Sequence, residues 1–145
     1  MENSLKELVV LLRTMQLFYH NCHNVCFGAT FLSDHNLFAD FYGQIEDDYD
    51  SVAERLIGLY GKQHLSLKEI MEKVEDLVEE LQEPNKAAVE GMLAQGGLLE
   101  FRLKSTIDML CKSTELSEGS RNLLAQVADN AEMRIYKIRQ RMTNE

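Results

Sequence analysis

The sequence predicts an all-α protein, a bundle of four long helices with a short helix in the central crossover. Apolar residues recur at steps of three, four or seven along four long segments, which is the spacing of one helix face. Glycine, serine and a single proline, Pro84, separate these segments. No stretch shows the alternating pattern of a strand. The 145 residues suffice for a helical core, and we expect one domain over residues 1–145.

The first helix is predicted from a capping pattern near the N-terminus. Ser4 is followed three residues later by Glu7, which is the spacing of a capping box. An apolar stripe then continues toward Cys26 and ends near Gly28. We therefore expect the first helix to begin at Ser4 and to end before this glycine.

The second helix is predicted to be long and amphipathic, between residues 33 and 60. Its apolar positions are Phe38, Phe41, Ile45, Val52, Leu56 and Leu59. Ser33 or Asp34 supplies the N-terminal cap, because short polar side chains accept a hydrogen bond from the first turn. Gly61 marks the end, since glycine readily adopts the conformation that closes a helix.

The second half of the chain predicts one short helix and two long ones. Residues 65–82 form an amphipathic connector helix, in one piece or two. Pro84 separates it from a third long helix over residues 85–112, and Ser117 caps the last helix. The third helix contains three glycines, Gly91, Gly96 and Gly97. Each costs about 1 kcal/mol relative to alanine, so we expect close helix packing there.

The composition describes an acidic globular protein. Its formal net charge of −9 argues against general affinity for nucleic acid, because phosphate contacts need clustered lysine and arginine. A membrane span needs about 20 consecutive apolar residues, and no apolar run approaches that length. The N-terminus does not resemble a secretory signal. Three cysteines without a paired spacing indicate free thiols. We therefore expect a cytoplasmic protein with no membrane partner.

Four side chains of the types that bind iron or zinc are His23, His35, Asp50 and Glu54. If His35 and Asp50 share the second helix, fifteen residues separate them by roughly 22 Å, so one chain cannot close both around one ion. Asp50 and Glu54 lie about 60° and about 100° around the helix from His35, on one broad face. Two helices packed antiparallel would set His35 of one chain against Asp50 and Glu54 of the other. The two-fold axis would pass near Gly43, where the backbones can approach closely.

The order of these ligands resembles the ferroxidase signature of the Dps mini-ferritins, the DNA-binding proteins from starved cells. His23 is followed after eleven residues by His35, after fourteen by Asp50, and after three by Glu54, within the segment DDYDSVAERL. The segment SEGSRNLLAQVADNAEMRIYKIRQRM, residues 117–142, resembles the last helix of that family. The resemblance implies a ferritin-like four-helix subunit, assembled from antiparallel dimers into a hollow homo-oligomer of twelve chains.

The resemblance also implies a function. The assembly would be an iron-storage cage that oxidises ferrous iron with peroxide or oxygen and protects against oxidative damage. His23 and His35 of one chain and Asp50 and Glu54 of its partner would be the catalytic and metal-binding residues. Each dimer interface would hold two sites, with one or both iron positions of a site filled and zinc as a substitute ion. DNA binding is disfavoured, because the chain is acidic and begins without a lysine-rich tail.

Two positions depart from the family pattern. The family usually has an acidic ligand one turn after the second histidine, where this chain has Ala39. Asp47 lies on the same stripe as Asp50 and Glu54 and is a candidate replacement. The tryptophan that commonly follows the first histidine is Asn24 here. These departures motivate an alternative function, a Dps-like structural or partner-binding helical module with a decayed metal site.

Two further groups of residues have competing interpretations. Cys22 and Cys26 lie on one side of the first helix beside His23, but a zinc site needs four ligands and no second cysteine pair exists, which favours buried thiols. The basic residues of the last helix are Arg134, Lys137, Arg139 and Arg141. They predict favourable charge at a helix C-terminus in preference to DNA contact.

Overall fold

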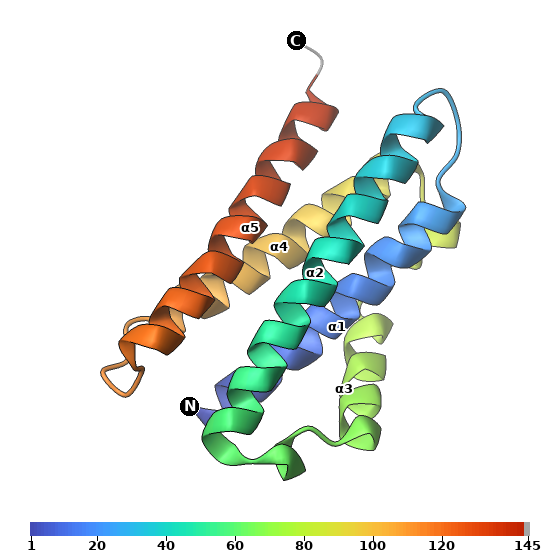
Figure 1. The fold of residues 1–145 in the computed structure, drawn as a ribbon. Coiled ribbons are helices and arrows are strands. Elements are labelled where there is room, and N and C mark those ends of the chain that lie inside the picture. Colours follow the sequence, from blue (N-terminus) through green and yellow to red (C-terminus); the bar gives the residue numbers. More distant parts are fainter. Residues whose placement is uncertain (144–145) are drawn as a thin grey trace.

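The computed structural model describes residues 1–143. Its helices are α1 (Glu2–Val25), α2 (Phe31–Tyr60), the short 3₁₀ helix η1 (Lys62–His64), α3 (Leu67–Glu79), a second 3₁₀ helix η2 (Pro84–Lys86), α4 (Val89–Leu110) and α5 (Glu118–Met142). Figure 1 shows the long helices packed side by side with the shorter α3 beside α1, and the N-terminus and the end of α5 at opposite ends of the bundle. No strand occurs within residues 1–143. The predicted all-α bundle with a helix in its crossover is confirmed.

The predicted N-terminal caps of the first two helices are wrong. Helix α1 begins at Glu2, so Ser4 lies inside its first turn and no side chain caps the helix. Helix α2 begins at Phe31 after Thr30, so both predicted caps, Ser33 and Asp34, lie within the first turn. The Asp34 carboxylate instead accepts hydrogen bonds from the side chains of Thr30 and Arg141, at 2.6 Å and 2.8 Å. The Asp34 carboxylate is therefore used in a tertiary contact with Arg141, and it does not cap the backbone as the local pattern predicted.

The other predicted boundaries follow local chemistry more closely. Gly61 ends α2 with a φ of 104°, a conformation that side chains rarely adopt. Ser66 caps α3, and Ser117 caps α5 by accepting a hydrogen bond from the Ser120 amide at 3.1 Å. Helix α4 begins at Val89, later than residue 85, because the chain after Pro84 first makes a 3₁₀ turn.

The core forms between α1 and α2 on one side and α4 and α5 on the other, with α3 covering part of α1. Leu8, Leu12 and Phe38 are among its fully buried side chains. The close packing expected at the glycines of α4 is confirmed at Gly96, where a Cβ atom would come within 2.9 Å of the Tyr19 ring. Any larger residue would push against a fully buried aromatic side chain.

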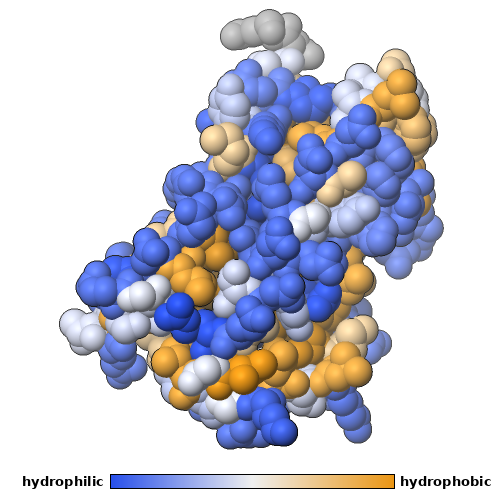
Figure 2. Space-filling view, viewed as in Figure 1, coloured by the Kyte–Doolittle hydropathy of each residue, from blue (hydrophilic) through white to orange (hydrophobic). Residues whose placement is uncertain are grey.

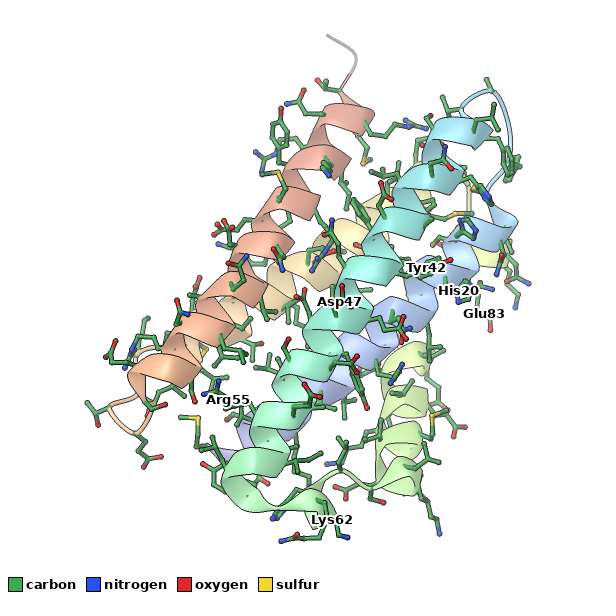
Figure 3. All side chains as sticks on the ribbon, in the orientation of Figure 1. His20, Tyr42, Asp47, Arg55, Lys62 and Glu83 are labelled. Atoms are coloured by element: carbon green, nitrogen blue, oxygen red, sulfur yellow. The ribbon has the colours of Figure 1, made fainter. Side chains whose placement is uncertain are left out.

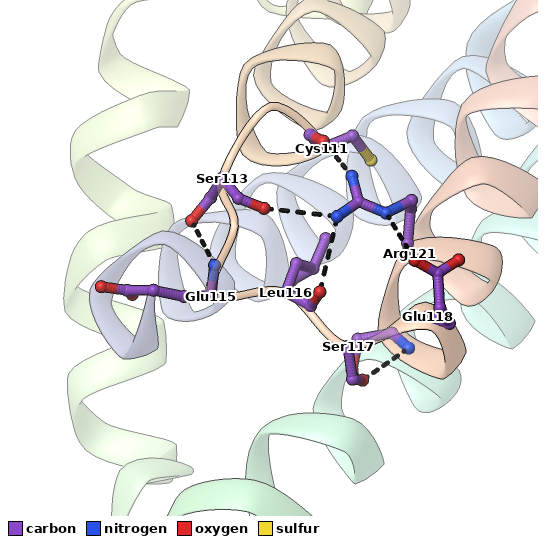
Figure 4. Close-up of polar contacts among 8 residues, drawn as sticks. Cys111, Ser113, Glu115, Leu116, Ser117, Glu118 and Arg121 are labelled. Atoms are coloured by element: carbon purple, nitrogen blue, oxygen red, sulfur yellow. Dashed lines mark hydrogen bonds and ion pairs between the residues drawn. The ribbon is translucent and has the colours of Figure 1, made fainter.

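Arg121 organises the loop between α4 and α5. Its guanidinium donates to the backbone carbonyl of Cys111 at the end of α4, to that of Ser113 at 3.3 Å and to that of Leu116 at 3.5 Å (Figure 4). The last carbonyls of a helix have no partner within the helix, so the guanidinium satisfies groups that would otherwise need water. This residue therefore fixes the turn that positions α5.

The surface of the single chain leaves several large apolar side chains exposed. Figure 2 shows a mostly hydrophilic face, with hydrophobic residues near the loop between α1 and α2 and at the lower end of the molecule. Phe27, Leu32 and Leu67 are 62%, 74% and 77% exposed. No helix within residues 1–143 is long and apolar enough to cross a membrane.

Candidate metal centre

The structure brings His23 and His35 together where α1 ends and α2 begins. The His23 Nδ1 atom lies 2.8 Å from the backbone oxygen of His35, and the His35 Nδ1 atom lies 2.8 Å from the backbone oxygen of His23. The two rings stack with their centroids 3.7 Å apart and their planes 18° apart. We call this reciprocal arrangement of His23 and His35 the histidine clasp.

The clasp fixes the protonation pattern of both rings. A backbone carbonyl only accepts hydrogen bonds, so each Nδ1 atom must carry the hydrogen. In the neutral imidazole the other nitrogen, Nε2, then has the free lone pair that binds a metal ion. Metal-binding histidines are commonly oriented in this way, by a hydrogen bond from the second ring nitrogen to a carbonyl or carboxylate. Both rings therefore keep a free Nε2 atom, the form in which a histidine can bind a metal ion.

Other aromatic rings surround the clasp. Phe31 stacks on His35 at 5.0 Å, Tyr42 meets His23 edge-on at 5.5 Å, and His20 stacks on Tyr42 at 4.3 Å. Figure 3 shows His20 and Tyr42 side by side, from α1 and α2. Tyr42 is not among the site residues predicted from the sequence. It lies two helical turns after His35 on the same face of α2, and this spacing could have identified it.

The carboxylates predicted as ligands lie elsewhere on the same helix. Helix α2 is unbroken from Phe31 to Tyr60, so His35 and Asp50 do share one helix. Asp50, Glu54 and the candidate Asp47 are all exposed, and Figure 3 shows Asp47 farther along α2 than Tyr42. Within residues 1–143, no three His, Cys, Asp or Glu side chains gather closely enough to hold a metal ion. One chain therefore presents the histidines and the carboxylates as two separate groups.

The position one turn after His35 contributes no ligand. Ala39 is half-buried there, and its neighbour Asp40 is exposed. Cys22 and Cys26 are both buried, which confirms the interpretation as buried thiols. Burial raises the pKa of both thiols, so they stay neutral and are poor zinc ligands. The Cys26 thiol donates to the His23 carbonyl at 3.6 Å, beside the clasp.

The basic residues of α5 do not form one exposed group. Arg134 is fully buried, so the interpretation of this residue as a helix-end charge is wrong. It lies two turns before the end of α5, on the face that packs into the bundle. Arg141 does lie in the last turn, but it pairs with Asp34 through Nε to Oδ1 at 2.8 Å and Nη2 to Oδ2 at 3.0 Å. This pair fastens the end of α5 to the residue that precedes His35.

Solved Dps structures share the fold of this chain over almost its whole length. Dps from Thermosynechococcus elongatus is 16% identical with a TM-score of 0.86, and the match covers 99% of this chain and 90% of that one. A Listeria innocua Dps variant with two histidines changed to glycine is 20% identical with a TM-score of 0.81, covering 96% and 91%. This chain has the Dps fold.

A third solved structure with a similar fold is a Dps from another bacterium. Dps from Vibrio cholerae, described as a member of a broad superfamily of ferritin-like diiron-carboxylate proteins, is 16% identical with a TM-score of 0.74, covering 98% of this chain and 88% of that one. No protein-family model and no curated protein matches the sequence. The resemblance to Dps that the ligand spacing indicated is thus confirmed at the level of the fold.

Proposed function

We propose that this protein is a Dps-type ferroxidase and iron-storage subunit that takes ferrous iron as its substrate. Two chains pair antiparallel, so that His23 and His35 of one chain and Asp50 and Glu54 of the other bind iron, and six such dimers form a hollow cage. The Dps fold over nearly the whole chain supports the assembly. The histidine clasp is the observation that carries the proposed site.

The clasp carries the proposal because it prepares two nitrogen ligands and leaves them incomplete. Both Nδ1 atoms are engaged, so two neutral Nε2 atoms remain as ligands in one place. No carboxylate of the same chain joins them within residues 1–143. The exposed Asp50 and Glu54 form a group without a nitrogen ligand. An antiparallel partner would bring carboxylates to the histidines and histidines to the carboxylates.

The chemistry follows from the charge of the ligands. Two ferrous ions give two electrons to one hydrogen peroxide, which takes up two protons and leaves as two waters. Asp50 and Glu54 place negative oxygens beside the iron, and these stabilise the ferric product more than the ferrous substrate because the attraction grows with the charge of the ion. The imidazoles hold the ion while it changes charge. The net charge of −9 draws cations toward the cage.

Subunit mixing tests the shared site. The first variant carries His23→Gln and His35→Gln, and the second carries Asp50→Asn and Glu54→Gln. Each variant alone is expected to oxidise ferrous iron with peroxide no faster than buffer, measured by ferric absorbance. Co-expressed in equal amounts, they should regain about a quarter of the parental rate per chain, because half of the dimers are mixed and each mixed dimer has one complete site.

The mixing experiment tests the oxidation and the sharing of the site between chains separately. Differently tagged variants and native mass spectrometry establish that mixed assemblies have formed. If the parent is no faster than buffer, the proposed ferroxidase is wrong. If the parent is active but the verified mixed assembly is not, the sharing of the site between chains is wrong. A light-scattering mass far from twelve chains would contradict the cage.

A second candidate function is a Dps-like structural or partner-binding module. Ala39 favours it, because the position one turn after His35 offers no ligand and only exposed carboxylates such as Asp47 remain as replacements. This candidate has the helical bundle without the oxidation, and a light-scattering mass far from twelve chains would favour it. A crystal soaked in ferrous iron without oxygen distinguishes the two functions, since bound iron between His35 and the partner acids supports the ferroxidase and empty sites support the module.

We propose no DNA binding by the basic end of α5. Arg134 is buried and Arg141 is paired with Asp34, so two of its four basic side chains are already engaged. Lys137 and Arg139 remain, in a chain of net charge −9. Too few cations are left to neutralise several phosphates. A gel shift at physiological salt should show unretarded DNA, and clear retardation would contradict this proposal.

A further inference from the structure

A buried polar cluster, distinct in its residues from the histidine clasp, lies between the four long helices. Each long helix contributes one member, namely Tyr19 from α1, Asp48 from α2, Glu100 from α4 and Arg134 from α5. Tyr19, Glu100 and Arg134 are fully buried, and Asp48 is 6% exposed. Charged side chains are almost never buried without partners, so this cluster needs a physical explanation.

The Arg134 guanidinium lies between the acceptors of the cluster. Its Nε atom donates to Glu100 Oε2 at 2.7 Å, and its Nη1 atom donates to Gln44 Oε1 at 3.2 Å. The same Nη1 atom forms an ion pair with Asp48 Oδ2 at 3.5 Å. One positive side chain therefore faces two carboxylates and a side-chain carbonyl.

The cluster is not fully satisfied by its own members. The Tyr19 hydroxyl donates to Glu100 Oε2 at 2.7 Å, and Asn130 donates to Asp48 Oδ1 at 3.0 Å. Within residues 1–143, three buried atoms make no hydrogen bond, and these are Asp48 Oδ2, Glu100 Oε1 and Arg134 Nη2. Two of the three are carboxylate oxygens, so the centre has more acceptor capacity than its one cation uses.

This cluster places one guanidinium between inward-facing carboxylates from two other helices. Ferritin-like carboxylate proteins hold metal ions at the middle of the bundle, with inward-facing carboxylates from several helices. Here the inward-facing carboxylates are present on α2 and α4, and the cation among them is the guanidinium from α5. We propose that Arg134 is a built-in cation that fills a latent divalent-metal site formed by Asp48, Glu100 and Gln44, and so keeps metal out of the bundle core.

The charges and donor atoms of the cluster indicate which ion would replace the guanidinium. Without the guanidinium, two buried carboxylates would face each other with no cation, a state that only a proton or another cation relieves. Truncation of arginine also leaves room for an ion with water beside these oxygens. The donor set is all oxygen, which suits manganese, magnesium or calcium better than the soft metals that prefer sulfur. This proposal does not rest on the ferroxidase function.

Manganese binding to Arg134→Ala tests the proposal. All variants carry Asp50→Asn and Glu54→Gln, so that the carboxylates of the proposed iron site contribute nothing, and the remaining surface carboxylates are the same in every variant. Free and bound Mn²⁺ are distinguished by electron paramagnetic resonance, and folding is checked by circular dichroism. Arg134→Ala is expected to bind about one more ion per chain than the matched background. Glu100→Gln added to it should remove the gain, and Arg134→Lys, which keeps a cation, should show none.

The latent metal site can be tested whether Arg134→Ala is folded or unfolded in metal-free buffer. A folded Arg134→Ala without additional Mn²⁺, or with a gain that Glu100→Gln leaves unchanged, overturns the proposal. If Arg134→Ala is unfolded in metal-free buffer, Mn²⁺ or methylguanidinium at low millimolar concentration should restore its helical signal, and should not do so when Glu100→Gln is added. Failure of both cations to restore it also overturns the proposal.

Discussion

The substitution Arg141→Ala should destabilise the protein by removing the fastening between α5 and α2. It deletes the hydrogen bonds to Asp34 at 2.8 Å and 3.0 Å and the bond from Nη2 to Thr30 Oγ1 at 2.9 Å. The fully buried Asp34 carboxylate then keeps only the Thr30 hydroxyl as a donor. Loss of a fully buried ion-pair partner costs about 3–5 kcal/mol, and a hydrogen bond to a charged group is worth about 1.5–3 kcal/mol.

The arginine side chain is 22% exposed, so water partly screens the pair and the lower range applies. We expect the free energy of unfolding to fall by about 2–3 kcal/mol and Tm by about 5–10 °C for a chain of this size. Urea denaturation followed by circular dichroism measures this change. Light scattering must show that the parent and the variant have the same oligomeric mass, because assembly shifts the apparent stability.

A double-mutant cycle with Asp34→Asn isolates the contact. The double variant should lose less stability than the sum of the two single variants, because asparagine leaves no buried charge after the arginine is removed. Arg139→Ala, at an exposed arginine of the same helix, is the control and should change the free energy of unfolding by less than about 0.5 kcal/mol. Additive effects, or an Arg141→Ala variant as stable as the parent, would refute the assigned contact.

The same pair predicts a pH dependence. Burial raises the pKa of Asp34, but the hydrogen bonds from Arg141 and Thr30 outweigh this effect and hold it below the ordinary value of 3.8. A carboxyl with a lowered folded-state pKa contributes stability above its unfolded pKa and loses it as the pH falls through the folded pKa. The stability difference between the parent and Arg141→Ala should therefore shrink below about pH 4. A constant difference would contradict the assignment.

Three further predictions concern packing, capping and buried charge. Gly96→Ala should lower the free energy of unfolding by about 1–3 kcal/mol, because its Cβ would lie 2.9 Å from the Tyr19 ring. Gly97→Ala has 4.0 Å of clearance and should be neutral or gain up to about 1 kcal/mol, measured in the same urea series. Ser117→Ala should cost about 1 kcal/mol by removing the cap of α5, and Ser117→Asp should restore it. Burial raises the pKa of Glu100 although Arg134 opposes it, so its ionisation reduces stability as the pH rises above 4.5. The stability cost of Glu100→Gln should consequently be smaller at pH 7 than at pH 4.5, and the opposite trend would contradict the buried charge.

The helical pattern allowed the fold to be predicted because the core of this protein is built from long amphipathic faces. Gly61 and Ser117 act through their own turns, so their roles were visible in the chain. The caps predicted at Ser4 and Asp34 were wrong for two reasons. The first turn of α1 begins at Glu2 without a side-chain cap, and the Asp34 carboxylate is taken by a residue more than one hundred positions later.

Part of the candidate site was also predictable from the sequence, and part depended on the tertiary structure. The spacing of His23, His35, Asp50 and Glu54 predicted the ligand types and a site shared by two chains, since helix geometry sets the distance between residues on α2. The reciprocal hydrogen bonds of the histidine clasp, which set the tautomer of each ring, were not predictable. They depend on how α1 and α2 align across a five-residue loop, and no local pattern encodes that alignment.

The sequence by itself determined where the helices lie and which faces are apolar, and it predicted which side chains bind iron. Only the tertiary structure decided which charges are buried. Asp48 appears in an ordinary acidic run and Arg134 in a basic one, yet both lie in the core with Glu100. The period of a helix fixes the face of each residue, but a buried charge is tolerated only where another helix brings its partner to the same level, and that register is a property of the packed bundle.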